Sequence, residues 1–173
     1  MRSTRGFSLI ELLIVIAIIL IIAAIAIPSL LQARMAAHES SAAGSLSAIK
    51  SAEVAYFTAY PTVGYSPDII SLGGAVPCTP SSTTACLIDS GLSAATPGGN
   101  GKAGYFFLVT GVMTGGAVIN TAYVAGAAPM VVHSSANRDF CVTNDGVLRS
   151  QMGSPGDTPV NNIAACIAFP VAQ

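Results

Sequence analysis

The sequence predicts an α+β fold in which a long N-terminal α-helix packs on an antiparallel sheet of about four strands. Three stretches carry this prediction. Residues 7–28 are almost entirely apolar, and residues 29–60 lack proline and place apolar side chains at helical spacing. After residue 104 the pattern changes to short apolar runs separated by Gly, Pro and Asn-Asp-Gly turns, which is typical of strands.

The chain carries few charges. Hydrophobic residues make up 52% of its 173 residues and charged residues only 9%, whereas an ordinary soluble domain has about 25% charged residues. Such a surface is either partly covered by a partner or rich in uncharged polar residues, and composition favours neither reading. The net charge is −1 without a cluster of Lys or Arg, which argues against nucleic acid as the main partner.

The apolar segment from Phe7 to Ile27 predicts a membrane-spanning helix. Its 21 residues correspond to a helix about 30 Å long, which matches the hydrocarbon core of a bilayer. Arg2 and Arg5 precede it, so the positive-inside rule predicts a cytoplasmic N-terminus and an exported C-terminal domain. An ordinary signal peptide fits less well, because the apolar core is long and no clear small-residue cleavage site follows it.

Glu11 is the unusual residue of this segment. A carboxylate at the centre of a membrane helix costs up to roughly 3 kcal/mol, so it needs a partner or a function. It either lies at the membrane interface near the arginines, or it pairs with a new α-ammonium made by cleavage between Gly6 and Phe7. Ser8 is interpreted only as a small residue near the charged end. Pro28 removes one helical hydrogen bond, which predicts a bend or a local loosening of the helix.

The string Gly6-Phe7-Ser8-Leu9-Ile10-Glu11, with its short basic leader and the apolar helix that follows, resembles the signature of type IV pilins and their pseudopilin relatives. The resemblance implies a prepilin leader of residues 1–6, which a membrane peptidase removes after Gly6, and N-methylation of the new N-terminal Phe7. It also implies that Glu11 pairs with the N-terminus of a neighbouring subunit and sets the register of assembly. Pro28 stands where such helices commonly carry a proline.

The same resemblance implies partners and a location. The mature chain is expected first in the inner membrane, in contact with lipid, and then in an extracellular helical filament of copies of itself and other pilins. A prepilin peptidase, an inner-membrane platform protein and a cytoplasmic assembly ATPase are the expected machinery. Leaving lipid for a helix bundle exchanges one apolar medium for another, so we expect an external motor.

Residues 29–60 are predicted to continue the helix as an amphipathic half that ends near Ala59, because Tyr60-Pro61 stops it. His38 is interpreted as an exposed helix residue rather than a metal ligand. Side chains three or four residues apart form one apolar stripe, which we expect to pack on the sheet of the same subunit. The stripe consists of Leu46, Ile49, Ala52, Tyr56 and Ala59.

Residues 61–104 are predicted to form a long connection, because they contain five prolines and a Gly-Gly-Asn-Gly turn sequence. A loop of this length is unusual in a compact domain unless it is cross-linked or functional. Cys78 and Cys86 could close a nine-residue loop within it. An even number of cysteines in an exported domain favours disulfides.

Residues 105–173 are predicted to form the sheet and a C-terminal tail. The tail from Ser150 onward has little regular pattern, and a disulfide between Cys141 and Cys166 would tie it to the fourth strand. Four cysteines allow three pairings, and only local spacing favours this one together with Cys78–Cys86. The apolar runs expected to form the strands are Tyr105–Val112, Ala117–Val124, Met130–His133, Asp139–Thr143 and Val147–Arg149, the last two joined by an Asn-Asp-Gly turn.

The sequence carries no catalytic motif. His38 and His133 are the two histidines, and no zinc-protease, nucleophile-elbow, phosphate-loop or C-x-x-C pattern occurs. We therefore predict no enzyme activity, no cofactor and no metal site.

Three functional hypotheses remain open at this point. The first is a structural subunit of a type IV pilus that serves adhesion, twitching motility or DNA uptake. The second is a pseudopilin of a type II secretion system; two cysteine pairs and a tail without a recognisable calcium site favour the pilin. The remote third is a single-pass anchored protein that never assembles and keeps its six-residue leader.

Overall fold

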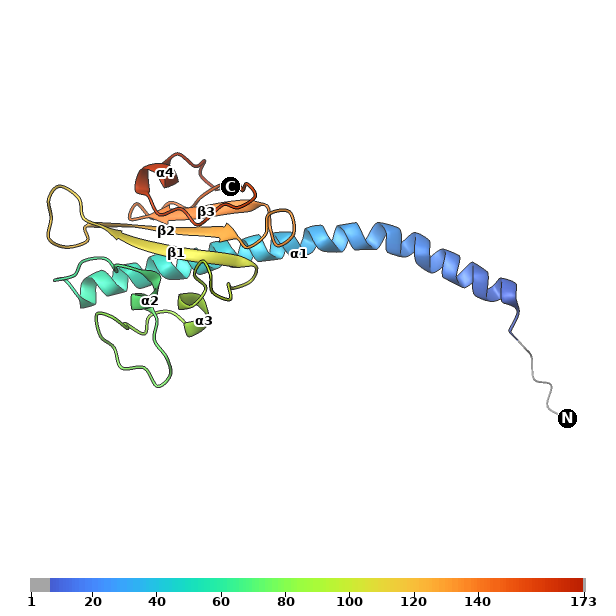
Figure 1. Ribbon diagram of the computed structural model, residues 1–173, viewed down its shortest axis with the longest axis horizontal. Helices are drawn as coiled ribbons and strands as arrows, with labels where there is room; N and C mark the ends of the chain where they lie inside the picture. Colours follow the sequence, from blue (N-terminus) through green and yellow to red (C-terminus); the bar gives the residue numbers. More distant parts are fainter. Residues whose placement is uncertain (1–6, 173) are drawn as a thin grey trace. The chain divides into compact units, whose positions relative to one another are not determined.

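The structure is a computed structural model that describes residues 7–172 (Figure 1). Two compact units follow each other along the chain, divided between Arg34 and Met35. Helix α1 contributes residues to both units. The elements are α1 (Leu9–Ala59), α2 (Ile69–Leu72), α3 (Ser90–Ser93), β1 (Tyr105–Val112), β2 (Ala122–Pro129), β3 (Arg138–Thr143), β4 (Arg149–Met152) and α4 (Ile163–Ile167).

The first unit contains the apolar part of α1. Its large side chains are exposed in the isolated chain, from 47% for Val15 to 80% for Leu9. Among the described residues, α1 is the one helix that is long and apolar enough to cross a membrane. The helix continues through Pro28, whereas the predicted bend there stays a prediction.

The second unit is built on a four-stranded antiparallel sheet with the strand order β1-β2-β3-β4. Residues 42–56 of α1 pack on one face of this sheet, which confirms the predicted α+β architecture. Alternate residues of β1, β2 and β3 point to the helix, as the period of two requires. The shared core includes Leu46, Ile49 and Tyr56 of α1 and Tyr105, Phe107, Val109, Tyr123, Ala125, Phe140 and Val142 of the sheet.

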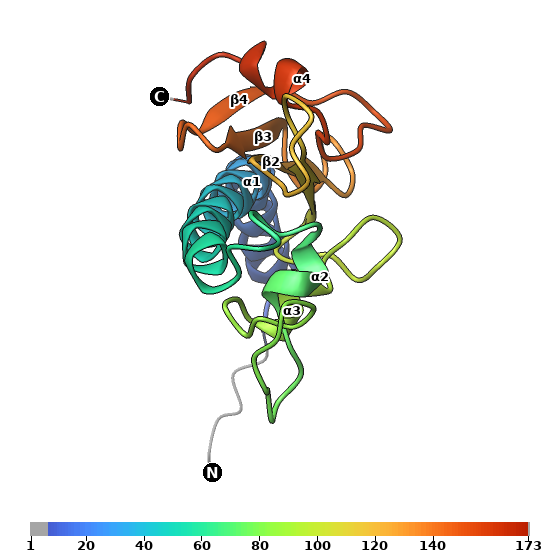
Figure 2. The ribbon, with the colours of Figure 1, turned by 90° about the vertical axis from the view of Figure 1, so that its left-hand side faces the viewer.

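The C-terminal segment covers the opposite face of the sheet (Figure 2). Val124 of β2 and Cys141 of β3 point to this side and pack with Cys166 of α4 and with Phe169. All eight residues of β2 are therefore buried. We call this face the outer face and residues 153–172 the tail.

The apolar stripe of α1 differs from the prediction at its end. Leu46, Ile49, Ala52 and Tyr56 are buried as expected. Ala59 is exposed, and Glu53 is buried instead. Glu53 has the spacing of the stripe, but the predicted stripe did not include this acid.

Two predicted strands have different bounds in the structure. The run Ala117–Val124 was expected to pair, but β2 begins at Ala122, and residues 113–121 form the hairpin loop between β1 and β2. Within this loop, Gly115 and Gly116 have φ angles of +63° and +77°, and Val118 is 93% exposed. Strand β2 contains several small residues (Ala125, Gly126, Ala127 and Ala128), which fit in a strand that is covered on both faces of the sheet. Strand β4 begins at Arg149 rather than at Val147.

The predicted strand Met130–His133 is wrong. His133 adopts a φ angle of +64°, and its N–H donates to the Ala136 carbonyl at 3.0 Å, so the chain turns. Helix α1 provides partners for this loop: His38 Nδ1 donates to the Ser135 carbonyl at 2.8 Å. His38 is accordingly half-buried rather than exposed. A segment whose polar groups are satisfied in this way needs no strand partner.

The long connection is tied down at several points. Asp68 accepts a hydrogen bond from the N–H of Ser71 and caps α2 (2.8 Å). Asp89 caps α3 by accepting from the N–H of Leu92 (3.0 Å). Asp89 also forms an ion pair with Lys102 at 2.7 Å, and the hydrogen bond from Lys102 lowers the pKa of Asp89. A disulfide between Cys78 and Cys86 closes the loop between the two short helices.

Candidate assembly segment and disulfide-bound tail

The N-terminal end of α1 is held by Ser8 and Glu11. The helix begins at Leu9, and the N–H of Ser8 donates to Glu11 Oε2 at 3.0 Å. The Ser8 carbonyl accepts from the N–H of Leu12 at 3.3 Å. This is half of a capping box, in which an acid three residues into the helix satisfies the N–H of the capping residue. The S-x-x-E spacing was readable in the sequence, where Ser8 was interpreted only as a small residue.

Glu11 is the single acidic residue between Phe7 and Arg34. Its neighbours along the helix are large apolar side chains, and Phe7 before the helix is 77% exposed. Such a surface is unstable in water, because each large apolar side chain gains about 1.5–3 kcal/mol on burial. The segment therefore requires either lipid or other helices around it. Gly6, the expected cleavage residue, lies outside the described residues.

The second region of interest is the tail, which a disulfide ties to the sheet. Cys141 of β3 and Cys166 of α4 are bonded with a Cα–Cα distance of 5.8 Å, and both residues are fully buried. Together with Cys78–Cys86, this is the pairing that the sequence analysis favoured, and no cysteine is free. The bond fixes the tail at α4, because Cys166 lies 25 residues after Cys141 in the chain.

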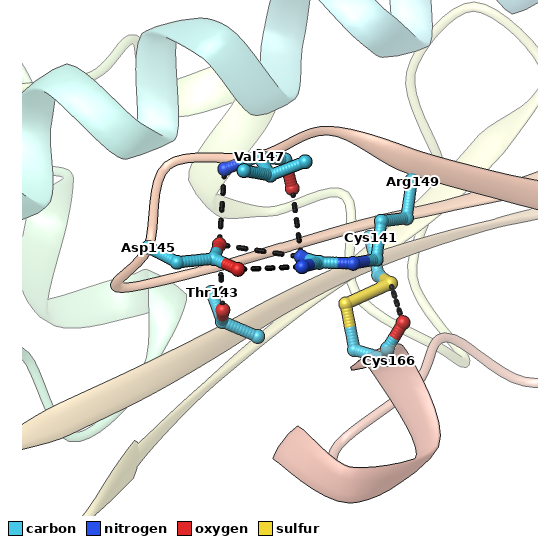
Figure 3. Close-up of polar contacts among 6 residues, drawn as sticks. All are labelled: Cys141, Thr143, Asp145, Val147, Arg149 and Cys166. Atoms are coloured by element: carbon cyan, nitrogen blue, oxygen red, sulfur yellow. Dashed lines mark hydrogen bonds and ion pairs between the residues drawn. A yellow bond between two sulfur atoms is a disulfide. The ribbon is translucent and has the colours of Figure 1, made fainter. Parts of the chain in front are cut away.

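A network of polar contacts fixes the turn next to this disulfide (Figure 3). Arg149 Nη2 donates to Asp145 Oδ2 at 2.6 Å and Nη1 donates to Oδ1 at 3.2 Å. Oδ1 also accepts from Thr143 Oγ1 at 2.8 Å and from the N–H of Val147 at 3.0 Å. The hydrogen bonds from Arg149 hold the pKa of Asp145 down, at about 2. The network also explains why β4 begins at Arg149 rather than at Val147. The N–H of Val147 donates to Asp145 and is therefore not available to pair with β3.

Comparison with known proteins decides the family. A family profile described as the prokaryotic N-terminal methylation motif matches residues 1–27. The chain is also 40% identical over 91 residues to the type IV wide pilus major component PilA4 of Thermus thermophilus. That alignment covers 52% of this chain and 68% of the relative. The chain belongs to the type IV pilin family. No solved structure matches this pilin.

The candidate functional residues of the pilin fall in two places. Phe7 and Glu11 lie at the start of the apolar segment, where the methylation profile matches. The four cysteines lie in the second unit, in the connection and around the tail. The two groups belong to different compact units, so each is a separate candidate site.

Two buried acids of the pilin were missed by sequence reasoning. Glu53 is fully buried in the main core, where its carboxylate accepts from the N–H of Ser66 at 2.9 Å and from the Ser66 hydroxyl. Asp139 of β3 is 4% exposed. Burial raises the pKa of each carboxyl to about 7. Helical spacing pointed to Glu53, whereas nothing in the sequence around Asp139 distinguished it.

Proposed function

We propose that the chain is a structural subunit of a type IV pilus, made as a membrane-anchored precursor and assembled through the apolar segment of α1. One observation carries the proposal: an unburied apolar helix with a single acid near its N-terminal end. Such a helix is suited first to lipid and then to a bundle of sister helices, where many apolar side chains are packed together. The Thermus relative, a major component of a wide pilus, favours a pilus over the short filament of a secretion system.

Maturation is the first step of the proposed function. A prepilin peptidase cuts between Gly6 and Phe7, and Phe7 is then N-methylated. The match of residues 1–27 to the methylation profile supports this step. The position of the bond supports it too, because Phe7 and Ser8 precede the first helical residue. A protease binds an extended chain more readily than a helix, since its backbone groups are free to pair.

Assembly is the second step. The N-terminus lies in the cytoplasm, the second unit lies outside the inner membrane, and a platform protein and an assembly ATPase move the subunit into the extracellular filament. Glu11 aligns neighbouring subunits, because a carboxylate among apolar helices is penalised unless it meets the Phe7 ammonium. Pro28 loosens the helix at one point, since it leaves the Ala24 carbonyl without its usual donor.

Two measurements test this function. Intact-mass analysis of the chain from cells should show the loss of residues 1–6 and the gain of one methyl group. Electron microscopy of a deletion strain should show the loss of surface fibres. Intact fibres with blocked protein secretion would instead indicate a pseudopilin. A chain that keeps Met1 and is found only as a monomer would indicate an anchored protein that does not assemble.

A further inference from the structure

Asp139 is a buried acid with an unpaired carboxyl oxygen. Its carboxyl lies on the outer face of β3, and its Oδ1 has no hydrogen-bond partner among residues 7–172. The residue is 4% exposed, so water solvates a negative charge there poorly. Leaving such an atom unpaired is destabilising, and more so when the group is charged. The neutral acid is therefore the form that this position favours.

The neighbouring polar side chains act on this charge in opposite directions. Gln151 pairs with Asp139 across the β3–β4 ladder and lowers the pKa of Asp139, whereas Asp157 of the tail contributes a second carboxylate that raises it. Asp157 also accepts a hydrogen bond from the N–H of Ser154 at 2.5 Å. Two adjacent carboxylates in such a site cannot both be ionised without a large penalty.

The loop of residues 153–158 lies directly over Asp139. A Cβ added at Gly153 would be 3.1 Å from Asp139 Oδ1, so the loop backbone is in close contact with the carboxyl. The N–H of Gly153 donates to the Asn137 carbonyl at 2.8 Å. The N–H of Asp157 donates to the Ser154 carbonyl at 3.0 Å, which closes the turn. The loop is thus attached to the sheet beside the acid pair.

Among the described residues, no base neutralises Asp139. The side chain of Arg138 is exposed, and that of Arg149 forms an ion pair with Asp145. From β1, Tyr105 presents its hydroxyl to the Arg138 carbonyl (2.7 Å). The surrounding elements contribute Glu39, which accepts from the N–H of Asn137 (3.0 Å), and His133, which contacts the Asn137 side chain (3.0 Å).

We propose that Asp139 and Asp157 share one proton and form a latch that holds the loop of residues 153–158 on the outer face below neutral pH and releases it above. The protonated Asp139 donates to the Asp157 carboxylate. When that proton is lost, two negative charges face each other under the loop, and the loop moves away. The raised pKa of Asp139, which burial causes first and Asp157 second, sets the transition near neutral pH.

Hydrogen exchange of the full-length chain in detergent micelles tests the latch. After correction for intrinsic exchange rates, the protection of amides 153–158 should fall on the order of tenfold or more between pH 5.5 and pH 8.5, because one pKa unit corresponds to a factor of ten. Asp139→Asn should remove this dependence, whereas Asp157→Asn should only reduce it, because burial alone still raises the pKa of Asp139. Glu53→Gln, a change at the other buried acid, should leave it in place.

Three outcomes would overturn the latch. The first is protection of the loop that does not change with pH in the unmodified chain. The second is pH dependence that is undiminished in Asp157→Asn, an exposed position whose substitution should not affect folding. The third is protection that follows added Ca²⁺ and its removal by a chelator instead of pH, because the acid pair would then hold a cation rather than a proton.

Discussion

Glu53 shows how a single residue can make the fold depend on pH. It is fully buried in the main core, and burial raises its pKa from 4.5 to about 7, although the two hydrogen bonds from Ser66 act in the opposite direction. The unfolded chain releases this proton near pH 4.5 and the folded chain near pH 7. Stability from the neutral carboxyl is therefore fully present below pH 4.5 and is lost as the pH rises through 7.

We expect Glu53→Gln to reduce this pH dependence. The shift corresponds to about 3 kcal/mol between the two ends of the range, and the amide can still accept from the N–H of Ser66. Urea unfolding of the full-length chain at pH 5 and pH 8 measures the change. The variant should lose less stability between these values than the unmodified chain does. The loss that remains in the variant comes from Asp139, whose pKa is also raised. An unchanged difference between the two pH values would show that Glu53 titrates normally.

Gly126 is required where the tail crosses β2. A Cβ at this position would lie 2.4 Å from the Val160 carbonyl oxygen and 2.5 Å from the Val160 nitrogen. Gly126→Ala should therefore push the tail away and lower the free energy of unfolding by about 1–3 kcal/mol. Gly44→Ala is the matched control, because a Cβ there meets nothing within 4 Å and alanine favours the helix by about 1 kcal/mol. Equal thermal stability of the two variants would contradict this account.

The tail is the element whose attachment depends on a covalent bond. Replacing Cys141 and Cys166 by alanine should lower stability by about 3 kcal/mol, the chain-entropy estimate for a loop of this length. Amides of α4 should lose protection from hydrogen exchange first, because few other contacts hold this short helix. The Cys78→Ala, Cys86→Ala variant is the comparison: it opens a shorter loop and should leave the protection of α4 unchanged. Loss of α4 protection in both variants would mean that the disulfides act on the whole domain.

The elements that local pattern determines were predictable from the sequence. The end of α1 at Ala59 follows from Tyr60-Pro61, and β1 from its uninterrupted apolar run. The position of β2 was not predictable, because the tail that covers its outer face comes more than thirty residues later in the chain. The loop of residues 130–137 depends on His38 and Glu39, almost one hundred residues earlier.

The candidate sites also divide into those that local sequence determines and those that depend on distant parts of the chain. The N-terminal signature is local, so Gly6, Phe7 and Glu11 could be named from the sequence alone. The acid pair Asp139 and Asp157 could not, because only the folded tail brings the second carboxylate to the first. The capping contact between Ser8 and Glu11 was within reach of the sequence, since its spacing is that of a known helix start.

At the scale of the whole molecule, the chain combines two different sources of stability. Residues 35–172 bury a core of their own, whereas the apolar residues of the first unit are exposed in the isolated chain. The second unit can therefore fold without a partner, and the first unit requires one. We expect the fold of the second unit to be insensitive to changes at the N-terminus of α1, so that variants there report on assembly and not on folding.

Glu11 is the residue with which to separate register from capping. Glu11→Ala removes both the charge and the acceptor for the N–H of Ser8, so it should leave leader cleavage largely intact but weaken or abolish filament formation. Glu11→Gln keeps an acceptor, because glutamine also serves in a capping box, but it removes the charge that would meet the Phe7 ammonium. If charge pairing sets the register, fibre yield by electron microscopy should fall in both variants.

If the helix cap alone matters, Glu11→Gln should assemble normally. Normal yield from Glu11→Ala would exclude both roles, while intact mass confirms in each case that residues 1–6 were removed.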